Sequence, residues 1–428
     1  MGAALPPDLP LSGRLASNEN PMNPDVIVIG AGLAGLTCAR RLQEAGRDCL
    51  VLEAGDAVGG RVRTERFDGF LLDRGFQVFL TAYPEARRWL DYSALQLRPF
   101  TPGTLVRLES GIHRVSDPFR APGHLWATLR APVGSWLDKL RIATFRHRAR
   151  RGSLESVFER SETTALEAFR AHGFSETILE RFLRPWLGGI FLEPDMATSS
   201  RMLDFVFRMF AEGAAAVPAR GMQAIPEQLA AGLPAVRLRS QVVSLEPGRV
   251  RLADGEVLEA RRIVVATEGS AAARLLPELV APRWRSTTTM YFAANISPVG
   301  EGTLVLNGTG RGCVNHAVVM SDVAPEYAPP GQALVAVSLH GLPEEEDAVL
   351  ARRVQAELEG WWGAQVAGWR WLKNVRVAEA LPVNTPLVQR PAEPVRQGVW
   401  VCGDHRDTAS IQGGMASGRR TADALVAG

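Results

Sequence analysis

The sequence predicts an α/β fold with two domains. One is a parallel-sheet domain assembled from discontinuous segments, and the other is an α+β domain with a mixed sheet and helices. Two observations predict the first: a buried strand followed by a glycine turn and a helix lies near the N-terminus, and a similar pattern lies near the C-terminus. Between them, alternating and helical patterns mix over a chain of 428 residues, which is long enough for two or three domains.

The first strand–turn–helix unit begins with Val26 to Ile29, a continuous apolar and β-branched run typical of a strand buried on both faces. Gly30, Gly32 and Gly35 follow with GxGxxG spacing. The first glycine permits a tight turn, the second permits close approach to a pyrophosphate, and the third permits close helix–sheet packing. The helix predicted over 33–45 would direct its N-terminal N–H groups at the phosphates.

The second strand of this unit is Cys49 to Leu52, and Glu53 stands at its end. A carboxylate about 20 residues past the last glycine accepts hydrogen bonds from ribose hydroxyls in Rossmann-type folds. A lone GxGxxG is weak evidence, but here it follows a strand and opens a helix, and an acidic residue ends the next strand. The unit therefore predicts dinucleotide binding.

The residues after Glu53 separate FAD from NAD. Leu52-Glu53-Ala54, Gly59-Gly60-Arg61 and Thr64 resemble the LEA…GGR…T segment of the flavin-containing amine oxidase and phytoene desaturase superfamily. Within it the chain is most similar to the desaturase-like or protoporphyrinogen-oxidase-like branch. The resemblance implies bound FAD as the resident redox cofactor.

A second motif at the C-terminal end completes the resemblance. Val399 to Cys402 is predicted as a buried strand, Gly403-Asp404 ends it, and Gly413-Gly414 opens a final helix over about 415–426. The resemblance implies that Asp404 hydrogen-bonds the ribityl chain. It also implies that the helix N-terminus at Gly414 and Met415 faces the N1/O2 edge of the flavin, where a helix dipole stabilises negative charge.

The resemblance also places middle segments at the cofactor. Gly75 to Gln77 would run beneath the isoalloxazine ring, although Phe76 and Phe79 are also consistent with ordinary core aromatics. Val242 would contact the adenine, and Ala266 and Thr267 end a buried strand at the cofactor edge. The full set of expected cofactor-binding residues is Gly30, Gly32, Leu33, Ala34, Gly35, Glu53, Ala54, Gly60, Arg61, Gly75, Phe76, Gln77, Val242, Ala266, Thr267, Gly403, Asp404, Gly413, Gly414 and Met415.

The predicted domains follow from these placements. Residues 25–100, 222–282 and 391–428 form the FAD-binding domain, and residues 101–221 and 283–390 form the substrate domain. Residues 1–24 read as a disordered tail without the features of a signal peptide, and either Met1 or Met22 is consistent with the true start.

Residues 84–97 predict a helix, and from Pro118 to about Leu203 the pattern predicts further helices. The substrate domain also carries three ambiguous stretches. Residues 133–151 predict a basic amphipathic helix with Trp136, Leu137, Leu140 and Phe145 near one stripe, which suits either a solvated helix or peripheral contact with an anionic membrane. Tryptophans within 360–372 either line an apolar cleft or simply pack. The residues of 186–210 are rich in large apolar side chains, as both a core and an apolar substrate pocket require.

Composition limits the other functions. The formal charge of +2 gives no reason to expect nucleic acid. Cys38, Cys49, Cys313 and Cys402 lack CxxC spacing and the histidines lack ligand spacing, so we expect no metal site and no disulfide framework. This cysteine usage is typical of a cytoplasmic protein, and peripheral binding at the inner face of a membrane is also consistent with it. No apolar run approaches the ~18–20 residues that cross a bilayer.

The expected chemistry is hydride transfer from a C–H of an apolar, isoprenoid-like or carotenoid-precursor-like substrate to flavin N5, with oxygen or a quinone as electron acceptor. Amine oxidases usually carry a lysine on a strand soon after the segment matched by Val264 to Thr267. The strand predicted over 286–294 has none, and Lys373 falls far beyond it. The C-terminal segment also lacks the aromatic pair that cages an amine.

No catalytic base is assigned by the sequence. The polar candidates are Gln77, His405 and Gln412, with Arg74 also expected near the flavin. An amine oxidase or protoporphyrinogen-oxidase-like activity is the alternative. A minor alternative is a non-enzymatic lipid- or protein-binding relative, as in Rab GDP-dissociation inhibitors. Glu53, Arg61 and Asp404 argue against that last reading.

Overall fold

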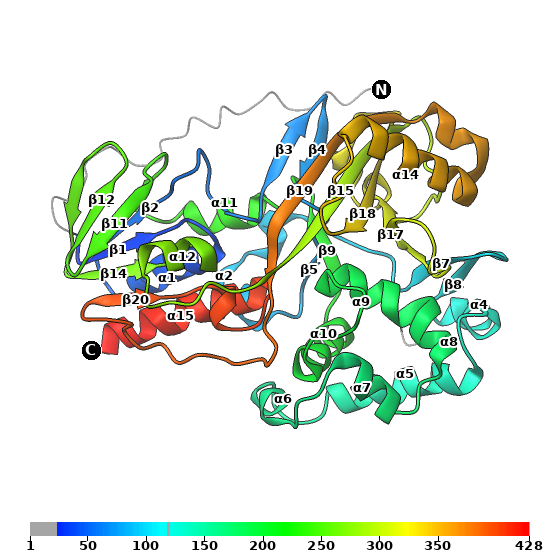
Figure 1. Cartoon of the computed structure of the whole chain (residues 1–428), viewed down its shortest axis with the longest axis horizontal. Coiled ribbons are helices and arrows are strands. Elements are labelled where there is room, and N and C mark those ends of the chain that lie inside the picture. The colour runs from blue at the N-terminus through cyan, green and yellow to red at the C-terminus, as the bar shows by residue number, and fades with distance from the viewer. Residues whose placement is uncertain (1–23, 118–119, 428) are drawn as a thin grey trace.

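The computed structural model describes residues 24–117 and 120–427. The predicted tail, apart from Pro24, and the choice between Met1 and Met22 lie outside the described residues. Figure 1 shows a parallel-sheet lobe on the left and a second lobe on the right, with two long strands running between them. The predicted α/β architecture with a mixed-sheet α+β part is confirmed.

A five-stranded parallel sheet forms the left lobe, and its strands come from distant parts of the chain. Its order is β10–β2–β1–β14–β20. Val26 pairs with both Cys49 and Arg262, so the N-terminal strand lies at the centre. The strands are β1 (Val26–Ile29), β2 (Cys49–Leu52), β10 (Val236–Arg237), β14 (Arg262–Val265) and β20 (Val399–Val401).

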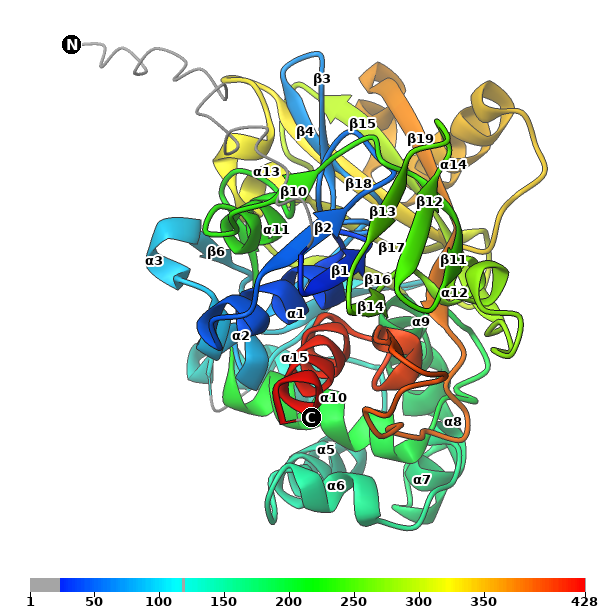
Figure 2. The ribbon, with the colours of Figure 1, turned by 90° about the vertical axis from the view of Figure 1, so that its left-hand side faces the viewer.

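Both faces of this sheet are covered, because β1 and β2 at its centre are apolar and buried at every position. Val26 and Val28 pack with α1 (Leu33–Glu44) and α15 (Ile411–Ala427), whereas Ile27 and Ile29 pack against a small antiparallel sheet and a short helix. Figure 2 shows α1 and α15 side by side beneath β1. The covering elements on the other face are β11 (Val242–Glu246), β12 (Arg249–Leu252), β13 (Val257–Glu259) and α12 (Gly269–Leu275).

A seven-stranded mixed sheet forms the upper part of the right lobe. Its order is β19–β15–β18–β17–β16–β7–β8, and all its pairs are antiparallel except β16 with β7. The strands are β7 (Thr104–Leu108), β8 (Gly111–Val115), β15 (Trp284–Ala294), β16 (Leu304–Asn307), β17 (Val314–Val319), β18 (Ala333–His340) and β19 (Arg370–Pro382).

One face of the mixed sheet is closed by α14 (Asp347–Trp362) and the 3₁₀ segment Gly363–Gly368. Trp361, Trp362, Trp369 and Trp371 all pack with this separate core, which also contains Met290 and Phe292. The packing reading of these tryptophans is therefore the right one, and the cleft reading is wrong. Residues of the opposite face, among them Tyr291, Val318 and Ala336, belong to the large core that also contains residues of β1 and of the helices.

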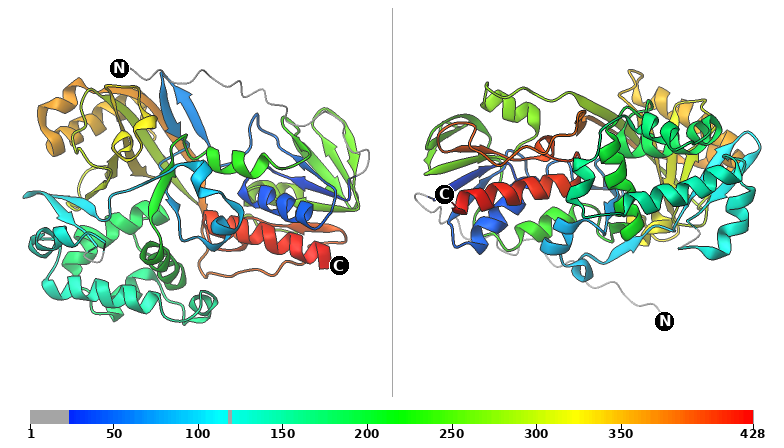
Figure 3. Two further views of the ribbon diagram at one scale, coloured as in Figure 1. Left: turned by 180° about the vertical axis from the view of Figure 1, so that it is seen from behind. Right: turned by 90° about the horizontal axis from the view of Figure 1, so that it is seen from below.

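Helices fill the lower part of the right lobe, as the sequence predicts for the stretch after Pro118. Figure 3 shows them as a layer of short helices beneath the mixed sheet. They are η1 (Pro122–His124), α4 (Leu125–Arg130), α5 (Trp136–Ala149), α6 (Glu155–Glu159), α7 (Ala165–Ala171), α8 (Glu176–Ile178), a π-helical turn (Leu179–Leu183), α9 (Arg184–Phe191) and α10 (Ser200–Glu212).

Some predicted helices differ in detail. The helix expected over residues 84–97 is two short ones, α2 (Pro84–Trp89) and α3 (Tyr92–Leu95), because Asp91 caps a new helix through bonds from Ser93 N and Ala94 N. In α5 the expected single apolar stripe does not form. Phe145 is buried among aromatic rings, whereas Trp136, Leu137 and Leu140 are exposed.

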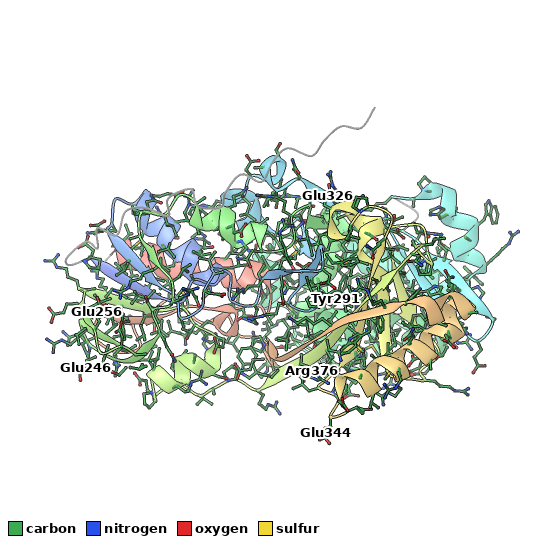
Figure 4. All side chains as sticks on the ribbon, turned by 90° about the horizontal axis from the view of Figure 1, so that it is seen from above. Glu246, Glu256, Tyr291, Glu326, Glu344 and Arg376 are labelled. Carbon is green, nitrogen blue, oxygen red and sulfur yellow. The ribbon has the colours of Figure 1, made fainter. Side chains whose placement is uncertain are left out.

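Buried hydrogen bonds join the lobes around Asp73, at the end of a hairpin. Its carboxylate accepts from Thr64 Oγ1, from Met222 N at 3.0 Å and from Tyr327 Oη at 2.9 Å, and its carbonyl accepts from Tyr291 Oη at 2.8 Å. Figure 4 places Tyr291 in the body of the molecule, far from Glu246 and Glu256 at the end of the parallel-sheet lobe. The remaining elements are β3 (Thr64–Phe67), β4 (Phe70–Asp73), β5 (Phe79–Leu80), β6 (Leu97–Pro99), β9 (Ala215–Pro218), α11 (Ala224–Ala230), α13 (Met320–Val323), η3 (Pro325–Tyr327) and η5 (Asp404–Arg406).

Candidate active site

A large cavity runs from the carboxyl ends of the parallel strands into the second lobe. Its volume is about 2140 Å³, whereas pockets for one small ligand measure about 300–1,000 Å³. Residues of β1, of the 59–65 turn, of β19 and of α5, α9 and α10 all line it. The cavity therefore has room for a dinucleotide and for a second molecule beside it.

The glycine turn has the shape that a phosphate-binding turn needs. Gly30 has a φ of +107°, and a Cβ there would lie 2.9 Å from Ala266 O. A Cβ on Gly35 would lie 2.0 Å from Gly30 O, so only glycine lets α1 approach the strand. At Gly32 a Cβ would meet no protein atom within 4 Å, and Gly32 lines the cavity at the helix N-terminus. A phosphate could occupy that space.

Glu53 lies in the cavity wall at the end of β2. Its carboxylate accepts hydrogen bonds from Ala31 N at 2.8 Å and from Gly55 N at 2.7 Å. These bonds hold the side chain across the turn, as a ribose-binding carboxylate requires. Ala54 lines the cavity beside it.

Arg61 joins three distant segments at the centre of the site. Its Nη2 lies 2.7 Å from Asp404 Oδ1, and its Nη1 donates to Ala380 O on β19 at 2.8 Å. Burial alone would lower the pKa of Arg61, but the Asp404 carboxylate outweighs burial and raises it. Arg61 therefore stays charged, and both it and Asp404 line the cavity.

The loop from Arg74 to Gln77 forms another part of the wall. Phe76 N donates to Thr289 Oγ1 at 3.0 Å, which fixes the loop to β15. The Gln77 side chain donates to Arg61 O at 2.8 Å and to Arg74 O at 3.0 Å. Gly75, Phe76 and Gln77 all line the cavity, whereas Phe79 is a buried core residue.

The C-terminal motif differs from expectation in where its helix begins. Helix α15 starts at Ile411, so Gly413 and Gly414 lie within its first turn. Gly414 N already donates to Ser410 O, and therefore it is not a free N–H for the flavin edge. Gly414 does line the cavity, whereas Gly413 is packed tightly on Thr408 O and Met415 is buried.

Two catalytic candidates from the sequence lie outside the cavity lining. Gln412 accepts from Glu85 N at 2.9 Å, so its side chain is held in the interface between α15 and α2. His405 packs against Gly403 and Gly269, and burial lowers its pKa to about 4. Of the three candidates, the structure brings only Gln77 to the cavity.

The other expected cofactor residues divide between the cavity lining and the core. Leu33, Ala34, Gly60, Val242, Ala266, Thr267 and Gly403 line the cavity, and so does Val243 beside Val242. Gly35, Gly413 and Met415 do not, because they serve the packing of α1 and α15. Among residues 24–117 and 120–427, no group of histidine, cysteine, aspartate or glutamate side chains could hold a metal ion.

The cavity continues past Gln77 into a chamber with a mainly apolar wall. Several of the large apolar residues predicted from the 186–210 stretch line it, while Phe191, Leu203, Phe205 and Met209 are core. The chamber wall includes Phe182, Trp186, Ile190, Met202, Phe207, Phe210 and Leu304.

Sequence reasoning misses two wall residues that strand pairing brings in. Lys373 on β19 lies opposite Tyr291 on β15, lines the cavity, and donates to Glu65 Oε2 at 2.6 Å. His316 on β17 packs edge-on to Phe76, with 5.1 Å between ring centroids, and burial lowers its pKa to about 3. No local signal reveals these partners, because the pairings span many residues.

FAD fits the residues present. The glycine turn, the open space at Gly32, the Glu53 carboxylate and the Arg61–Asp404 pair lie along one wall of a cavity large enough for a dinucleotide.

Comparison with known proteins identifies the family. The family model of flavin containing amine oxidoreductases matches residues 33–426. A 15-cis-phytoene desaturase of Narcissus pseudonarcissus is 24% identical over 480 residues, covering 97% of this chain and 82% of that protein. A coproporphyrinogen III oxidase of Propionibacterium freudenreichii is 28% identical over 190 residues, covering 42% and 34%.

Among solved structures, an oxidoreductase from Methanosarcina mazei superposes with a TM-score of 0.72 at 20% identity, covering 94% of this chain and 99% of that one. This likeness establishes the fold, and the family match adds the cofactor and the class of reaction. The chain belongs to the flavin-containing amine oxidoreductase family and is an FAD-dependent oxidoreductase.

Proposed function

We propose that the protein dehydrogenates an apolar, isoprenoid-like substrate, taking a hydride from a C–H bond. The observation that carries the proposal is the apolar chamber beyond Gln77, which is continuous with the proposed cofactor wall. The similarity to a 15-cis-phytoene desaturase over 97% of the chain supports the same substrate class.

FAD, when bound, supplies the hydride acceptor. The chain's own contribution is to orient the substrate and exclude water. Phe76 and Gln77 are fixed by Thr289 and Arg61, and the apolar wall desolvates whatever lies between them and α10. Gln77 donates both of its described bonds to carbonyls, so it positions the loop and is not a base.

The experiment is anaerobic flavin reduction, followed by absorbance in a stopped-flow instrument. Carotenoid precursors in detergent should bleach the flavin, whereas primary and secondary amines should not. Rapid bleaching by an amine, with no response to the precursors, would overturn the proposal. Oxygen and a quinone are then compared as electron acceptors by the rate of flavin reoxidation.

An oxidase of the protoporphyrinogen-oxidase-like kind is the second candidate. The similarity to a coproporphyrinogen III oxidase favours it, although that match covers 42% of this chain. An amine oxidase has less support. Lys373 does line the cavity, but its ammonium group is bound to Glu65, and the 400–414 segment contributes no aromatic side chain to the lining described here.

We also propose peripheral membrane contact through α4 and α5, which lie at the lower right of Figure 1. Trp126 and Trp136 are 69% and 64% exposed, and Leu125, Leu129, Leu137 and Leu140 are exposed with them. Within residues 120–151 the one acidic side chain, Asp138, is buried, so the exposed charges of that stretch are basic. Leu125, Leu129, Trp136 and Leu140 also line the cavity, which would let an apolar substrate pass from a bilayer.

Co-sedimentation with vesicles tests this contact. Binding should be stronger to vesicles of phosphatidylglycerol than of phosphatidylcholine, and Trp136→Ser with Leu140→Ser should weaken it. Val280→Ser is the matched control, because Val280 is 94% exposed outside these helices. Equal loss in both variants would overturn the contact. No helix of the described chain is long and apolar enough to cross a membrane.

We propose that the protein lies in the cytoplasm and makes this contact at the inner face of the membrane, a placement that its four free cysteine thiols support.

A further inference from the structure

The apolar chamber has a basic end. Among the cavity-lining residues that come from 100–215, Asp117 provides one carboxylate, and Arg120, Lys139 and Arg146 provide three cationic groups. Lys139 and Arg146 are partly buried, whereas Arg120 is exposed. A chamber for a neutral hydrocarbon has no need of cationic side chains in its lining, because removing a cation from water is costly.

Two of these cations share a single carboxylate oxygen. Arg120 Nε lies 3.9 Å and Arg146 Nε lies 3.8 Å from Asp117 Oδ2. Burial lowers the pKa of Arg120, Asp117 raises it, and the positive charge of Arg146 lowers it again. The two guanidinium groups therefore repel one another, and the trio carries a formal charge of +1.

Backbone carbonyls hold both guanidinium groups in place. Arg120 Nη2 donates to Gly213 O at 2.7 Å, and Arg146 Nη2 donates to Ala211 O at 3.2 Å. These carbonyls lie at the C-terminal end of α10, where the helix dipole is negative. The arginines are thus fixed before any ligand arrives, so little side-chain entropy is lost on binding.

Apolar side chains surround this basic pair. Phe210, Ile142 and Leu125 line the cavity beside it. A ligand that satisfies both features has a long apolar body and one anionic end. Guanidinium groups suit a carboxylate, because their N–H donors match its two oxygens.

We propose that Arg120 and Arg146 bind a carboxylate at the end of the substrate, so that an isoprenoid-like acid binds more tightly than a neutral isoprenoid of the same carbon skeleton. This inference rests on the proposed function, because it assumes that the apolar chamber holds the substrate. In this orientation the carboxylate end of the substrate points away from Arg61 and the cofactor wall.

The test compares retinoic acid with retinol, two isoprenoid probes that share a carbon skeleton and differ in the charged end. Each is titrated into the FAD-bound protein, and quenching of tryptophan fluorescence gives its Kd. Wild type should bind the acid at least tenfold more tightly. Arg120→Gln with Arg146→Gln should remove that preference and leave the Kd of retinol within about twofold.

Arg150→Gln is the matched control, since it removes the same charge from the exposed end of α5 and does not line the cavity. Asp117→Asn is a second variant, which should keep or increase the preference for the acid. Thermal melting and the flavin absorbance confirm that each variant is folded with FAD.

Three outcomes would overturn the inference. Equal binding of acid and alcohol to wild type refutes the carboxylate site. Weaker binding of the double variant to phosphatidylglycerol vesicles, with an unchanged preference for the acid, assigns the arginines to a lipid headgroup. If neither retinoid binds while carotenoid precursors still bleach the flavin, this inference fails and the proposed function stands.

Discussion

Asp73 gives a prediction of stability against pH. Burial raises its pKa from 3.8 to about 6, although bonds from Thr64, Met222 and Tyr327 act in the opposite direction. A carboxyl group with a raised pKa in the folded state binds protons more tightly there than in the unfolded chain. The folded protein therefore gains stability from this group as the pH falls from about 6 to 3.8, and loses it as the pH rises again.

The magnitude follows from the shift. A pKa difference of about two units corresponds to about 3 kcal/mol in the free energy of unfolding, at 1.36 kcal/mol per unit. Asp73→Asn does not titrate, so the difference between wild type and this variant isolates the effect from other carboxylates. Between pH 7.5 and pH 4.5, wild type should gain about 2 kcal/mol relative to the variant.

The assay is urea unfolding of the FAD-bound protein at a series of pH values from 7.5 to 4.5. Tyr327→Phe is a second test, because it removes a bond that lowers the pKa of Asp73, and it should shift the pH window upward. A difference between wild type and Asp73→Asn that stays constant with pH would refute the reasoning. If wild type instead lost stability relative to Asp73→Asn on acidification, the pKa of Asp73 in the folded protein would be lowered and not raised.

Three further predictions concern the cofactor wall and His405. Gly32→Val should fold with an unchanged melting temperature and lose FAD, whereas Gly35→Val should fail to fold, because its Cβ would meet Gly30 O at 2.0 Å. If the two variants changed melting temperature and flavin content equally, the distinction between the two glycines would be wrong. Glu53→Gln should raise the Kd of FAD about 10–100-fold in a flavin fluorescence titration, and a change within twofold would argue against its ribose role. His405→Leu should keep the rate of flavin reduction and raise the melting temperature, because neither ring nitrogen has a hydrogen-bond partner in the described part of the chain. A tenfold slower reduction would restore His405 as a catalytic candidate.

The cofactor side of the protein was predictable because its signals are local. The β1 strand, the glycine spacing and Glu53 lie within about 30 residues, the size of one βαβ unit, and each has a physical role that shows in the sequence. The structure has these elements as expected. The residue-by-residue cofactor set and the domain boundaries stay predictions.

The substrate side was less predictable because its contacts are long-range. Lys373 and His316 enter the cavity wall through pairing among β15, β17, β18 and β19, which no local pattern specifies. Asp91 divides a predicted helix, and Phe145 turns inward on α5, because tertiary packing overrides helical periodicity. The start of α15 at Ile411 was missed because Ser410, not a glycine, precedes it and bonds to Gly413 N.

The order of the parallel sheet also has a consequence for how the protein is made. Strand β1 leaves the ribosome early, but its neighbour β14 follows more than 200 residues later and β20 comes near the end of the chain. Arg61 likewise can form its bonds to Ala380 O and to the Asp404 carboxylate only after those residues have been synthesised. Such non-local contacts form slowly, so the nascent N-terminal half exposes apolar strands without partners. Flavin capture is then a post-translational event, and chaperone demand during synthesis should be high.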